Sequence, residues 1–499
     1  MIQIVYKYSV IAAIMDIKNL EMESKLYIDG KFKESSEKLN VLNPYNQEEL
    51  VQVSLGGESD VEEAVKSAQA AFDECKKLKT YEKSQALEFI SDELLRQKER
   101  LATILSLESG KPITQAEVEI VRGAQTFKLA SEFINHDHGE VIPLDILESS
   151  GERFGIVKNF PVGIVYGISP FNFPLNLVAH KVAPAIAAGC PIILKPASET
   201  PITSLELAKI FDKTHLPKAM FQVLPMTRQV GDLLIEDERI HMLSFTGSPG
   251  VGWKLKSRAG KKKVVLELGG DAAIYAHSDC DVDEVVGKAI IGSFANAGQI
   301  CISVQRLIVH SSIYEEFKTK FLEKVQSIVA GDPLNRETLM GPLINLKNKD
   351  RILEWMQEAQ DKGAIKLCGG EVVDESIITP IVFEAPEKGL NITEEEIFGP
   401  IVNLYKVSSK QEAIDMINSS QFGLQCGIFT NDNEFIFDCF EQIDCAGVVI
   451  NDFPTFRVDN MPYGGVKESG FGREGIKYAI KDMSEEKLLV MNRTNRYEK

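Results

Sequence analysis

Three side chains suited to carbonyl chemistry lie in separate stretches of the 499-residue chain. Cys301 follows a Gly-Gln turn, and the thiolate form of cysteine is a strong nucleophile. Glu267 lies in the apolar stretch 264–270, where desolvation would raise its pKa and suit it to general base work near neutral pH. Asn172 offers an amide donor between two phenylalanines. Taken singly, each has a simpler explanation: a core cysteine, a paired structural carboxylate and a turn cap.

A glycine-rich turn adds a candidate nucleotide site. Residues 245–252 join a predicted strand to a predicted helix and contain Gly247, Gly250 and Gly252. The turn is a loose variant of nucleotide-binding loops, in which the N–H groups that open a helix meet a phosphate. A plain helix cap is the alternative.

The overall charge and composition exclude several kinds of partner. The net charge of −18 repels phosphate backbones and anionic membranes, and no stretch of about 20 apolar residues occurs. Eight cysteines without paired spacing predict neither disulfides nor a metal site. We therefore expect a cytoplasmic protein that binds no nucleic acid, membrane or metal. Residues 1–25 are expected to be an N-terminal extension, unless Met15 or Met22 is the true start.

The apolar pattern predicts an α/β fold with a doubly wound, parallel sheet, because short buried strands alternate with helices between residues 155 and 270. A hairpin at 26–31 precedes this region, and a second alternating block follows from about 282 to 458. The expected helices are 59–76, 81–97, 100–108, 113–136, 203–213 and 282–297. The expected strands are 163–168, 191–194, 221–224 and 242–245.

These elements are expected to form two α/β domains and a small arm. Strands in the arm would join subunits of a homodimer or homotetramer, although a plain edge hairpin is an equal alternative. The expected boundaries are 26–140 and 162–270 for a dinucleotide-binding domain, 271–484 for a catalytic domain, and 141–161 and 485–499 for the arm.

The order of the motifs supports a family resemblance. In chain order they are Asn172, Lys195, 245–252, Glu267, Cys301, 394–400 (EEEIFGP) and 462–470 (PYGGVKESG). Glu267 and Cys301 lie 34 positions apart (301 − 267). In content, order and spacing, the chain from about Leu26 onward resembles the aldehyde dehydrogenase superfamily. Within it, the chain is most similar to lactaldehyde- and glyceraldehyde-type enzymes of archaea and bacteria.

The resemblance implies a mechanism for NAD(P)-dependent oxidation of an aldehyde. Cys301 attacks the carbonyl as a thiolate, and the Asn172 amide and the Cys301 backbone N–H hold the oxyanion. Hydride transfer leaves a thioester, which water activated by Glu267 hydrolyses. Two alternatives stay open: a CoA-acylating relative, which commonly lacks the base, and a catalytically silent structural protein on the same fold.

The resemblance also implies a cofactor site on a Rossmann-like domain. Lys195 would meet the adenosine ribose or its phosphate, Ser248 the pyrophosphate, and Glu396 the nicotinamide ribose. Ser198 replaces a glutamate of many NAD-preferring relatives and so favours NADP over NAD, unless Glu199 points inward. The full set of expected cofactor residues is Ser169, Pro170, Phe171, Lys195, Ser198, Glu199, Gly247, Ser248, Gly269, Glu396 and Phe398.

The substrate is expected to be a small hydroxylated aldehyde of the lactaldehyde or glyceraldehyde type. Phe171, Phe173 and Phe456 would contribute an aromatic lining. Arg122 and Arg457 lie where some relatives bind a substrate anion, and a guanidinium pair suits phosphate, sulfonate or carboxylate. An anionic aldehyde is therefore the alternative substrate, and two salt-bridged structural arginines are the alternative explanation.

Overall fold

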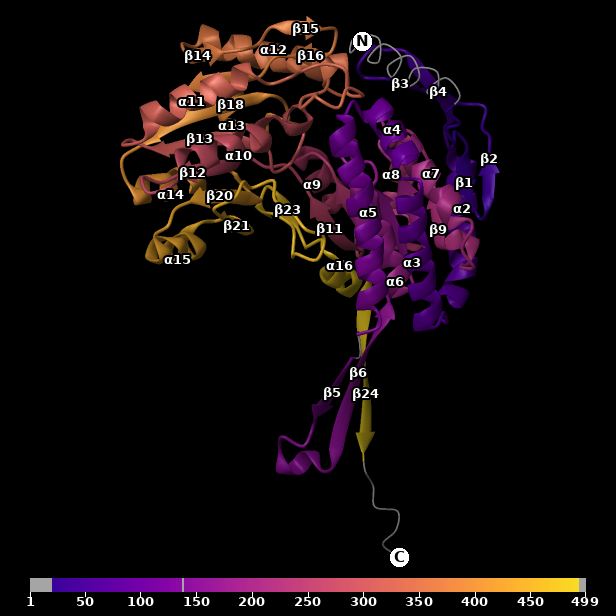
Figure 1. The fold of residues 1–499 in the computed structure, drawn as a ribbon. Helices are drawn as coiled ribbons and strands as arrows, with labels where there is room; N and C mark the ends of the chain where they lie inside the picture. Colours follow the sequence, from indigo (N-terminus) through magenta and orange to yellow (C-terminus); the bar gives the residue numbers. More distant parts are fainter. Residues whose placement is uncertain (1–19, 137–138, 493–499) are drawn as a thin grey trace, which may run out of the picture.

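The computed structural model describes residues 20–136 and 139–492. Most of the predicted N-terminal extension 1–25 and the end of the segment 485–499 lie outside these described residues. Figure 1 shows two sheets covered by helices, side by side, and a narrow three-stranded arm that projects from the first of them. The predicted class of two α/β domains is confirmed, whereas their boundaries stay a prediction.

The first sheet has eight strands in the order β2-β1-β9-β8-β7-β10-β11-β23. Its five central strands are parallel, as the alternation of strands and helices predicted. They are β7 (Ile164–Ile168), β8 (Ile192–Lys195), β9 (Phe221–Val223), β10 (Ile240–Thr246) and β11 (Lys263–Glu267). Both edges are antiparallel, a detail that the sequence pattern did not predict: β1 (Leu26–Ile28) with β2 (Lys31–Lys33) on one side and β23 (Gly470–Phe471) on the other.

Apolar residues on both faces explain why these strands are continuous apolar runs. Val165 and Ile192 pack into one cluster, and their neighbours Tyr166 and Ile193 pack into another on the opposite face. Side chains alternate between the faces of a strand, so a sheet buried on both sides needs apolar residues at every position. The covering helices are α2 (Glu58–Cys75), α3 (Thr80–Arg96), α4 (Lys98–Ser109), α5 (Ile113–Phe133), α6 (Asn176–Ala188), α7 (Ile202–Phe211), α8 (Arg228–Glu236), α9 (Pro249–Arg258) and α16 (Ile476–Asp482).

The second sheet has seven strands in the order β14-β17-β18-β13-β12-β20-β21, and all but the edge strand β14 are parallel to their neighbours. Its strands are β12 (Ala272–Ala276), β13 (Val304–His310), β14 (Ile365–Cys368), β17 (Ile381–Glu384), β18 (Ile401–Val407), β20 (Gln425–Phe429) and β21 (Gly447–Ile450). Its helices are α10 (Val282–Phe294), α11 (Tyr314–Gln326), α12 (Leu346–Asp361), α13 (Asn391–Glu394), α14 (Lys410–Asn418) and α15 (Asn433–Gln442).

Helix α10 ends three residues earlier than its apolar pattern predicted. Asn296 and Ala297 have φ angles of 50° and 54°, which no α-helix accommodates. Gly298 follows with φ 70°, and a Cβ there would lie 2.3 Å from the carbonyl oxygen of Gly399. The chain therefore turns sharply out of the helix just before Cys301.

The arm consists of β5 (Glu140–Pro143), β6 (Arg153–Pro161) and β24 (Ser484–Asn492), paired antiparallel in the order β24-β6-β5. The expected arm segments 141–161 and 485–499 thus contain strands that pair with each other, the second of them as far as the described residue Asn492. The arm exposes apolar side chains, among them Val141 and Leu489 at 72% and 55% of their surface.

Two short hairpins and one further pair of strands complete the sheets of the described residues. The hairpins are β3 (Lys38–Leu42) with β4 (Glu49–Ser54) and β15 (Val372–Asp374) with β16 (Ile377–Ile378), and the further pair is β19 (Phe422–Gly423) with β22 (Val466–Lys467). Within 20–136 and 139–492, no helix is long and apolar enough to cross a bilayer. The same residues contain no group of three or more His, Cys, Asp or Glu side chains arranged to hold a metal ion.

Candidate active site

The loop that carries Cys301 lies against the end of β11. A Cβ added at Gly270 would lie 2.2 Å from the carbonyl oxygen of Cys301, so only glycine permits this contact. The Cys301 sulfur lies 3.0 Å from the Tyr463 hydroxyl. Burial raises the pKa of the thiol to about 12, and the Tyr463 hydrogen bond acts in the opposite direction. The resting thiol is therefore protonated, and formation of the thiolate requires neighbouring groups that stabilise a negative charge on the sulfur.

Glu267, the last residue of β11, is buried, with 3% of its surface exposed. Neither of its carboxyl oxygens has a hydrogen-bond partner among the described residues. Burial, followed by the charge of Glu474, raises its pKa well above the usual range. A Cβ at Gly464 would lie 2.8 Å from Glu267 Oε1, which explains the glycine in the 462–470 motif. These features are those of a carboxyl that exchanges a proton during a reaction.

Asn172 is tied to the backbone that leads to Cys301. Its amide Nδ2 donates to the carbonyl of Gln299 at 2.9 Å, which leaves the second N–H of the same group for another acceptor. Gln299 is itself held, since it donates to the Pro342 carbonyl at 3.2 Å and accepts from the Ile344 N–H at 2.9 Å. The three predicted catalytic side chains thus meet in one place, although their roles stay predictions.

Behind these residues lies a network of buried charges that the sequence reasoning missed in part. Lys181 Nζ donates to the Thr246 hydroxyl at 2.7 Å and lies 3.2 Å from Glu474. The second oxygen of Glu474 binds Arg457 Nη2 at 3.1 Å. Lys181 lies in α6, whose residues from Asn176 to Ala187 are all buried. A lysine in so apolar a helix was the clue available from the sequence.

The two predicted substrate arginines both have carboxylate partners. Arg122 Nη2 lies 2.8 Å from Asp459 Oδ1, and His180 Nε2 lies 2.9 Å from the same oxygen. Arg457 contacts His180 at 3.3 Å and lies over the Tyr463 ring, 3.7 Å from its centre. The network therefore joins both arginines to each other through His180 and to Cys301 through Tyr463.

Several polar atoms of this region are buried without a hydrogen-bond partner among the described residues. Besides the two oxygens of Glu267, they are Asn172 Oδ1, His180 Nδ1, Arg122 Nε and Arg457 Nε. Buried polar atoms are nearly always paired, so such a concentration points to a polar ligand that completes the site.

The residues predicted to form an aromatic lining differ in how far they are buried. Phe173 is half-buried and carries the ammonium group of Lys111 over its ring at 3.6 Å. Lys111 is buried and pairs with Glu119. Phe456 has 43% of its surface exposed, and its carbonyl accepts a hydrogen bond from Gln425 at 3.2 Å.

The adenosine end of the predicted cofactor site is a hollow beside β8. It is lined by Tyr166, Ile168, Lys195, Arg228, Gly231, Asp232, Phe245, Val251 and Leu255. Lys195 makes no ion pair in the described chain, and burial lowers its pKa. Arg228, which the sequence reasoning missed, likewise has no carboxylate partner among the described residues, whereas Asp232 is paired with Arg258 at 2.6 Å. Two unpaired cations in one hollow suit a phosphate.

Ser198 and Glu199 are exposed on the loop that follows Lys195. Glu199 borders an open groove opposite the first turns of α12, which contribute Asn345, Asn348 and Arg351. Burial lowers the pKa of Lys195 and the charge of Glu199 opposes this effect, so Glu199 acts electrostatically on the predicted ribose site.

The glycine-rich turn leads into α9, whose N-cap is Ser248. The Ser248 side chain makes no capping hydrogen bond, so the first N–H groups of the helix are left for a ligand. Gly247 N–H donates to the carbonyl of Glu267 at 3.0 Å, which ties this turn to the predicted base.

The predicted nicotinamide end lies beside Glu267. Glu396 accepts the Gly270 N–H at 3.1 Å, and a Cβ at Gly269 would lie 2.3 Å from its Oε2. Burial raises the pKa of Glu396 to about 8. Phe171 and Phe398 meet edge to face at 5.7 Å. Ser169 N–H, just before Pro170, donates to the Lys195 carbonyl at 3.2 Å and so joins the two ends of the site.

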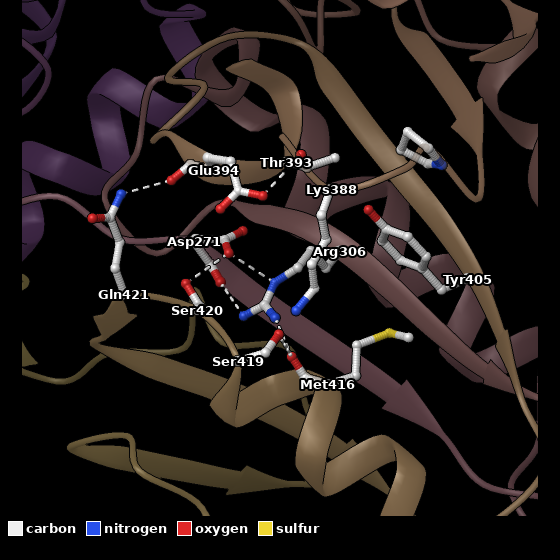
Figure 2. Close-up of a pocket in the computed structure, with 11 residues that line it drawn as sticks. Asp271, Arg306, Lys388, Thr393, Glu394, Tyr405, Met416, Ser419, Ser420 and Gln421 are labelled. Carbon is white, nitrogen blue, oxygen red and sulfur yellow. Dashed lines mark hydrogen bonds and ion pairs between the residues drawn. The ribbon is translucent and has the colours of Figure 1, made fainter. Parts of the chain in front are cut away.

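A second pocket, shown in Figure 2, is lined by Asp271, which follows Gly270 in the sequence, and by Arg306. Arg306 lies 2.9 Å from Asp271 and donates to the Met416 carbonyl at 2.7 Å. Ser420 donates to Asp271 at 2.9 Å, and Gln421 to the Glu394 carbonyl at 2.7 Å. These contacts connect Asp271, just before β12, with Arg306 of β13 and with Ser420 after α14, and they hold the start of β12 in place.

Two doubly wound domains that hold a thiol, an amide donor and a buried unpaired carboxyl, together with a hollow that contains two unpaired cations, are the features of a nucleotide-dependent oxidoreductase. The aldehyde dehydrogenase family model matches residues 32–489, and the chain belongs to this family. It is an NAD(P)-dependent oxidoreductase that converts aldehydes to acids, which confirms the predicted class of enzyme and cofactor.

Curated relatives and solved structures agree with this assignment. The chain is 40% identical to 3-sulfolactaldehyde dehydrogenase of Priestia megaterium over 94% of this chain and 98% of that protein. It is 38% identical to lactaldehyde dehydrogenase of Methanocaldococcus jannaschii, with 94% and 100% covered. Among structures, aldehyde dehydrogenase 21 of Physcomitrella patens in complex with the reaction product succinate is 43% identical, with a TM-score of 0.93 and 95% and 99% covered. A glyceraldehyde-3-phosphate dehydrogenase of Methanocaldococcus jannaschii complexed with NADP is 38% identical, with a TM-score of 0.88 and 92% and 100% covered.

Proposed function

We propose that the protein oxidises a short hydroxylated aldehyde that carries an anionic group, of the 3-sulfolactaldehyde kind, with NADP as the preferred cofactor. The observation that carries the proposal is an unbalanced positive charge in the buried network behind Cys301. The neutral lactaldehyde type is the second candidate, because several curated relatives are lactaldehyde dehydrogenases.

The charges of the network follow from its contacts. Despite burial, Lys181 and Arg457 lower the pKa of Glu474 to about 2, and His180 and Arg122 lower that of Asp459, so both carboxyls are ionised. Burial lowers the pKa of His180, so this imidazole is neutral at pH 7, and burial raises the pKa of Glu267 well above its usual range, which favours the neutral form of that carboxyl.

Three cations, Arg122, Arg457 and Lys181, therefore face two ionised carboxylates, and Arg473 adds a further positive charge near Glu267. A sulfonate, phosphate or carboxylate on the substrate would balance the excess and satisfy the unpaired Nε atoms of Arg122 and Arg457. A neutral aldehyde would neither balance this positive charge nor supply a charged acceptor for the two Nε atoms. A long apolar chain would bury these charges without a partner.

The catalytic roles proposed for this chain follow its geometry. The Cys301 thiolate forms the bond to the carbonyl carbon, while the free N–H of Asn172 and the backbone N–H of Cys301 hold the oxyanion. NAD(P), when bound, supplies the hydride acceptor. Glu267 then takes a proton from the water that hydrolyses the thioester. Its buried, unpaired oxygens support hydrolysis over acyl transfer to CoA.

The cofactor preference rests on the adenosine hollow. Lys195 and Arg228 offer two unpaired cations to a 2′-phosphate, and Ser198 adds no opposing charge. Ser248 at the start of α9 suits the pyrophosphate. The exposed apolar arm supports a homodimer or homotetramer, and a cytoplasmic location stays a prediction.

The test is a substrate panel assayed with NADP and NAD at matched concentrations. It compares 3-sulfolactaldehyde, succinic semialdehyde, glyceraldehyde 3-phosphate, lactaldehyde, glyceraldehyde and hexanal. The proposal expects the highest kcat/KM for a short anionic aldehyde with NADP. A higher value for lactaldehyde than for every anionic aldehyde would favour the second candidate, and a higher value for hexanal would contradict both.

A further inference from the structure

We propose that Tyr463 is a catalytic residue, whose phenolic O–H donates a hydrogen bond to the Cys301 thiolate and so sets the fraction of nucleophile that is ready to react. This inference rests on the proposed role of Cys301 as the nucleophile. It gives the tyrosine of the 462–470 motif a chemical role. In this motif, close packing had explained only a glycine.

The contact is direct and well supported by its surroundings. The Tyr463 hydroxyl and the Cys301 sulfur lie 3.0 Å apart. Tyr463 is 3% exposed and packs with Ile302 and Leu424 in a small apolar cluster around the sulfur. In such surroundings a single donor has a large effect, because little else is present to solvate a negative charge.

The phenol is held in place by its backbone. Tyr463 N–H donates to the Glu474 carbonyl at 3.1 Å, and Glu474 N–H donates back to the Tyr463 carbonyl at 2.6 Å. These two hydrogen bonds fix the backbone of Tyr463 to that of Glu474, which belongs to the buried charge network. The hydroxyl therefore faces the sulfur without the entropic cost of ordering a mobile side chain.

The direction of the hydrogen bond follows from the proton count. A thiolate has no hydrogen, so in the reactive state only the phenol can donate. Burial raises the pKa of Tyr463 well above its usual range, so the phenol keeps its proton. A hydrogen bond made to the charged form favours that form, and Tyr463 accordingly opposes the effect of burial on Cys301.

Arg457 strengthens this donor. Its guanidinium lies over the Tyr463 ring, 3.7 Å from the centre, and is anchored by Glu474 at 3.1 Å. A cation on the ring face draws electron density from the phenol and makes its O–H more positive. Arg457 also favours the thiolate directly, against the opposing charges of Glu396 and Glu267.

The same hydrogen bond serves both halves of the reaction. When the sulfur electron pair forms the C–S bond, the Tyr463 proton stays on the phenolic oxygen, and the Cys301 sulfur loses its negative charge. When water breaks the thioester, the C–S electron pair returns to sulfur as a thiolate, and Tyr463 stabilises this leaving group. No proton crosses between the two residues at any stage.

The decisive variant is Tyr463→Phe, which removes the hydroxyl and keeps the ring. The matched control is Tyr275→Phe, since Tyr275 is also buried and its hydroxyl lies 2.8 Å from His277, away from Cys301. The measurement is the rate of Cys301 alkylation by iodoacetamide from pH 6 to 10, resolved by peptide mass spectrometry. Below the titration midpoint of Cys301 this rate is proportional to the thiolate fraction, so a shift of the midpoint is measured as a change in rate at each pH. Melting temperature and binding of 2′,5′-ADP verify that each variant is folded.

In Tyr463→Phe the midpoint of Cys301 alkylation should rise by about one pH unit or more, which is a tenfold loss of thiolate at neutral pH. The burst of reduced cofactor should slow by a similar factor, with its acid limb moved to higher pH. Tyr275→Phe should change neither. An unchanged or lowered midpoint in a folded Tyr463→Phe protein would overturn the inference.

A second measurement covers the case of a variant that does not fold. Global replacement of tyrosine by the more acidic 3-fluorotyrosine should lower the Cys301 midpoint, since a more acidic phenol is a stronger donor. A midpoint that stays the same or rises would overturn the proposal. The proposed function fails by a different result: alkylation of Cys301 that leaves the enzyme active would remove Cys301 as nucleophile, whatever the midpoint does.

Discussion

The most informative perturbation of the substrate proposal is Arg457→Met, which removes the guanidinium charge and keeps an unbranched stem. Arg457 is almost fully buried, with 7% of its side chain exposed, and Glu474 retains Lys181 as a partner at 3.2 Å. The change therefore takes one positive charge from the site without leaving Glu474 unpaired. Arg122 and Lys181 then only balance the two ionised carboxylates, and Arg473 is the one positive charge left near Glu267 to attract a substrate anion.

The expected size follows from the charge and its burial. Two unit charges about 4 Å apart interact by about 4 kcal/mol at an effective dielectric constant of about 20, and truncating one partner of a buried pair costs about 2–5 kcal/mol. For an anionic aldehyde we therefore expect kcat/KM to fall by a factor of about 30 to 5,000 relative to lactaldehyde. Arg122→Met should act in the same direction by less, because 25% of its side chain is exposed.

The assay is the ratio of kcat/KM for 3-sulfolactaldehyde to that for lactaldehyde, measured at 340 nm with NADP. Arg457 also acts on Tyr463 and Cys301, but this effect is common to both aldehydes and cancels in the ratio. Arg336→Met, which breaks an exposed pair with Glu117, is the matched control. If both aldehydes lost the same factor, Arg457 would be a structural element of the network and the reasoning on charge would be refuted.

Three further predictions concern the chemistry and the cofactor. Cys301→Ser should abolish turnover and leave 2′,5′-ADP binding intact; activity within about tenfold of the wild type would remove the nucleophile assignment. Glu267→Gln should leave a single burst of reduced cofactor and stall steady turnover. Because burial raises the pKa of Glu267, its base form accumulates only as the pH rises, so the wild-type steady rate should increase with pH and the variant should lose this limb. Equal losses of burst and steady rate would point to another role. Ser198→Glu and Arg228→Ala should each weaken NADP far more than NAD in binding and in KM, and an unchanged ratio in both would show that neither residue faces the 2′-phosphate.

Much of the fold was determined by local sequence pattern. The continuous apolar runs at 163–168 and 191–194 predicted buried parallel strands, because a sheet covered on both faces needs apolar residues at every position. The Asp29-Gly30 pair predicted the hairpin between β1 and β2, and both residues have the positive φ angles that such a turn requires. The order of Asn172, Glu267 and Cys301 likewise predicted the family.

Tertiary structure decided the partners of the charged and reactive groups. Whether Arg122 and Arg457 were free or paired depended on Asp459 and Glu474, and the Cys301–Tyr463 contact joins residues 162 positions apart. Residue type and periodicity encode which side chains are buried, because burial depends on a residue's place in its own helix or strand. They do not encode which buried groups meet, because that depends on how separate elements pack, and the charge balance, pKa values and substrate preference of the site follow from those meetings.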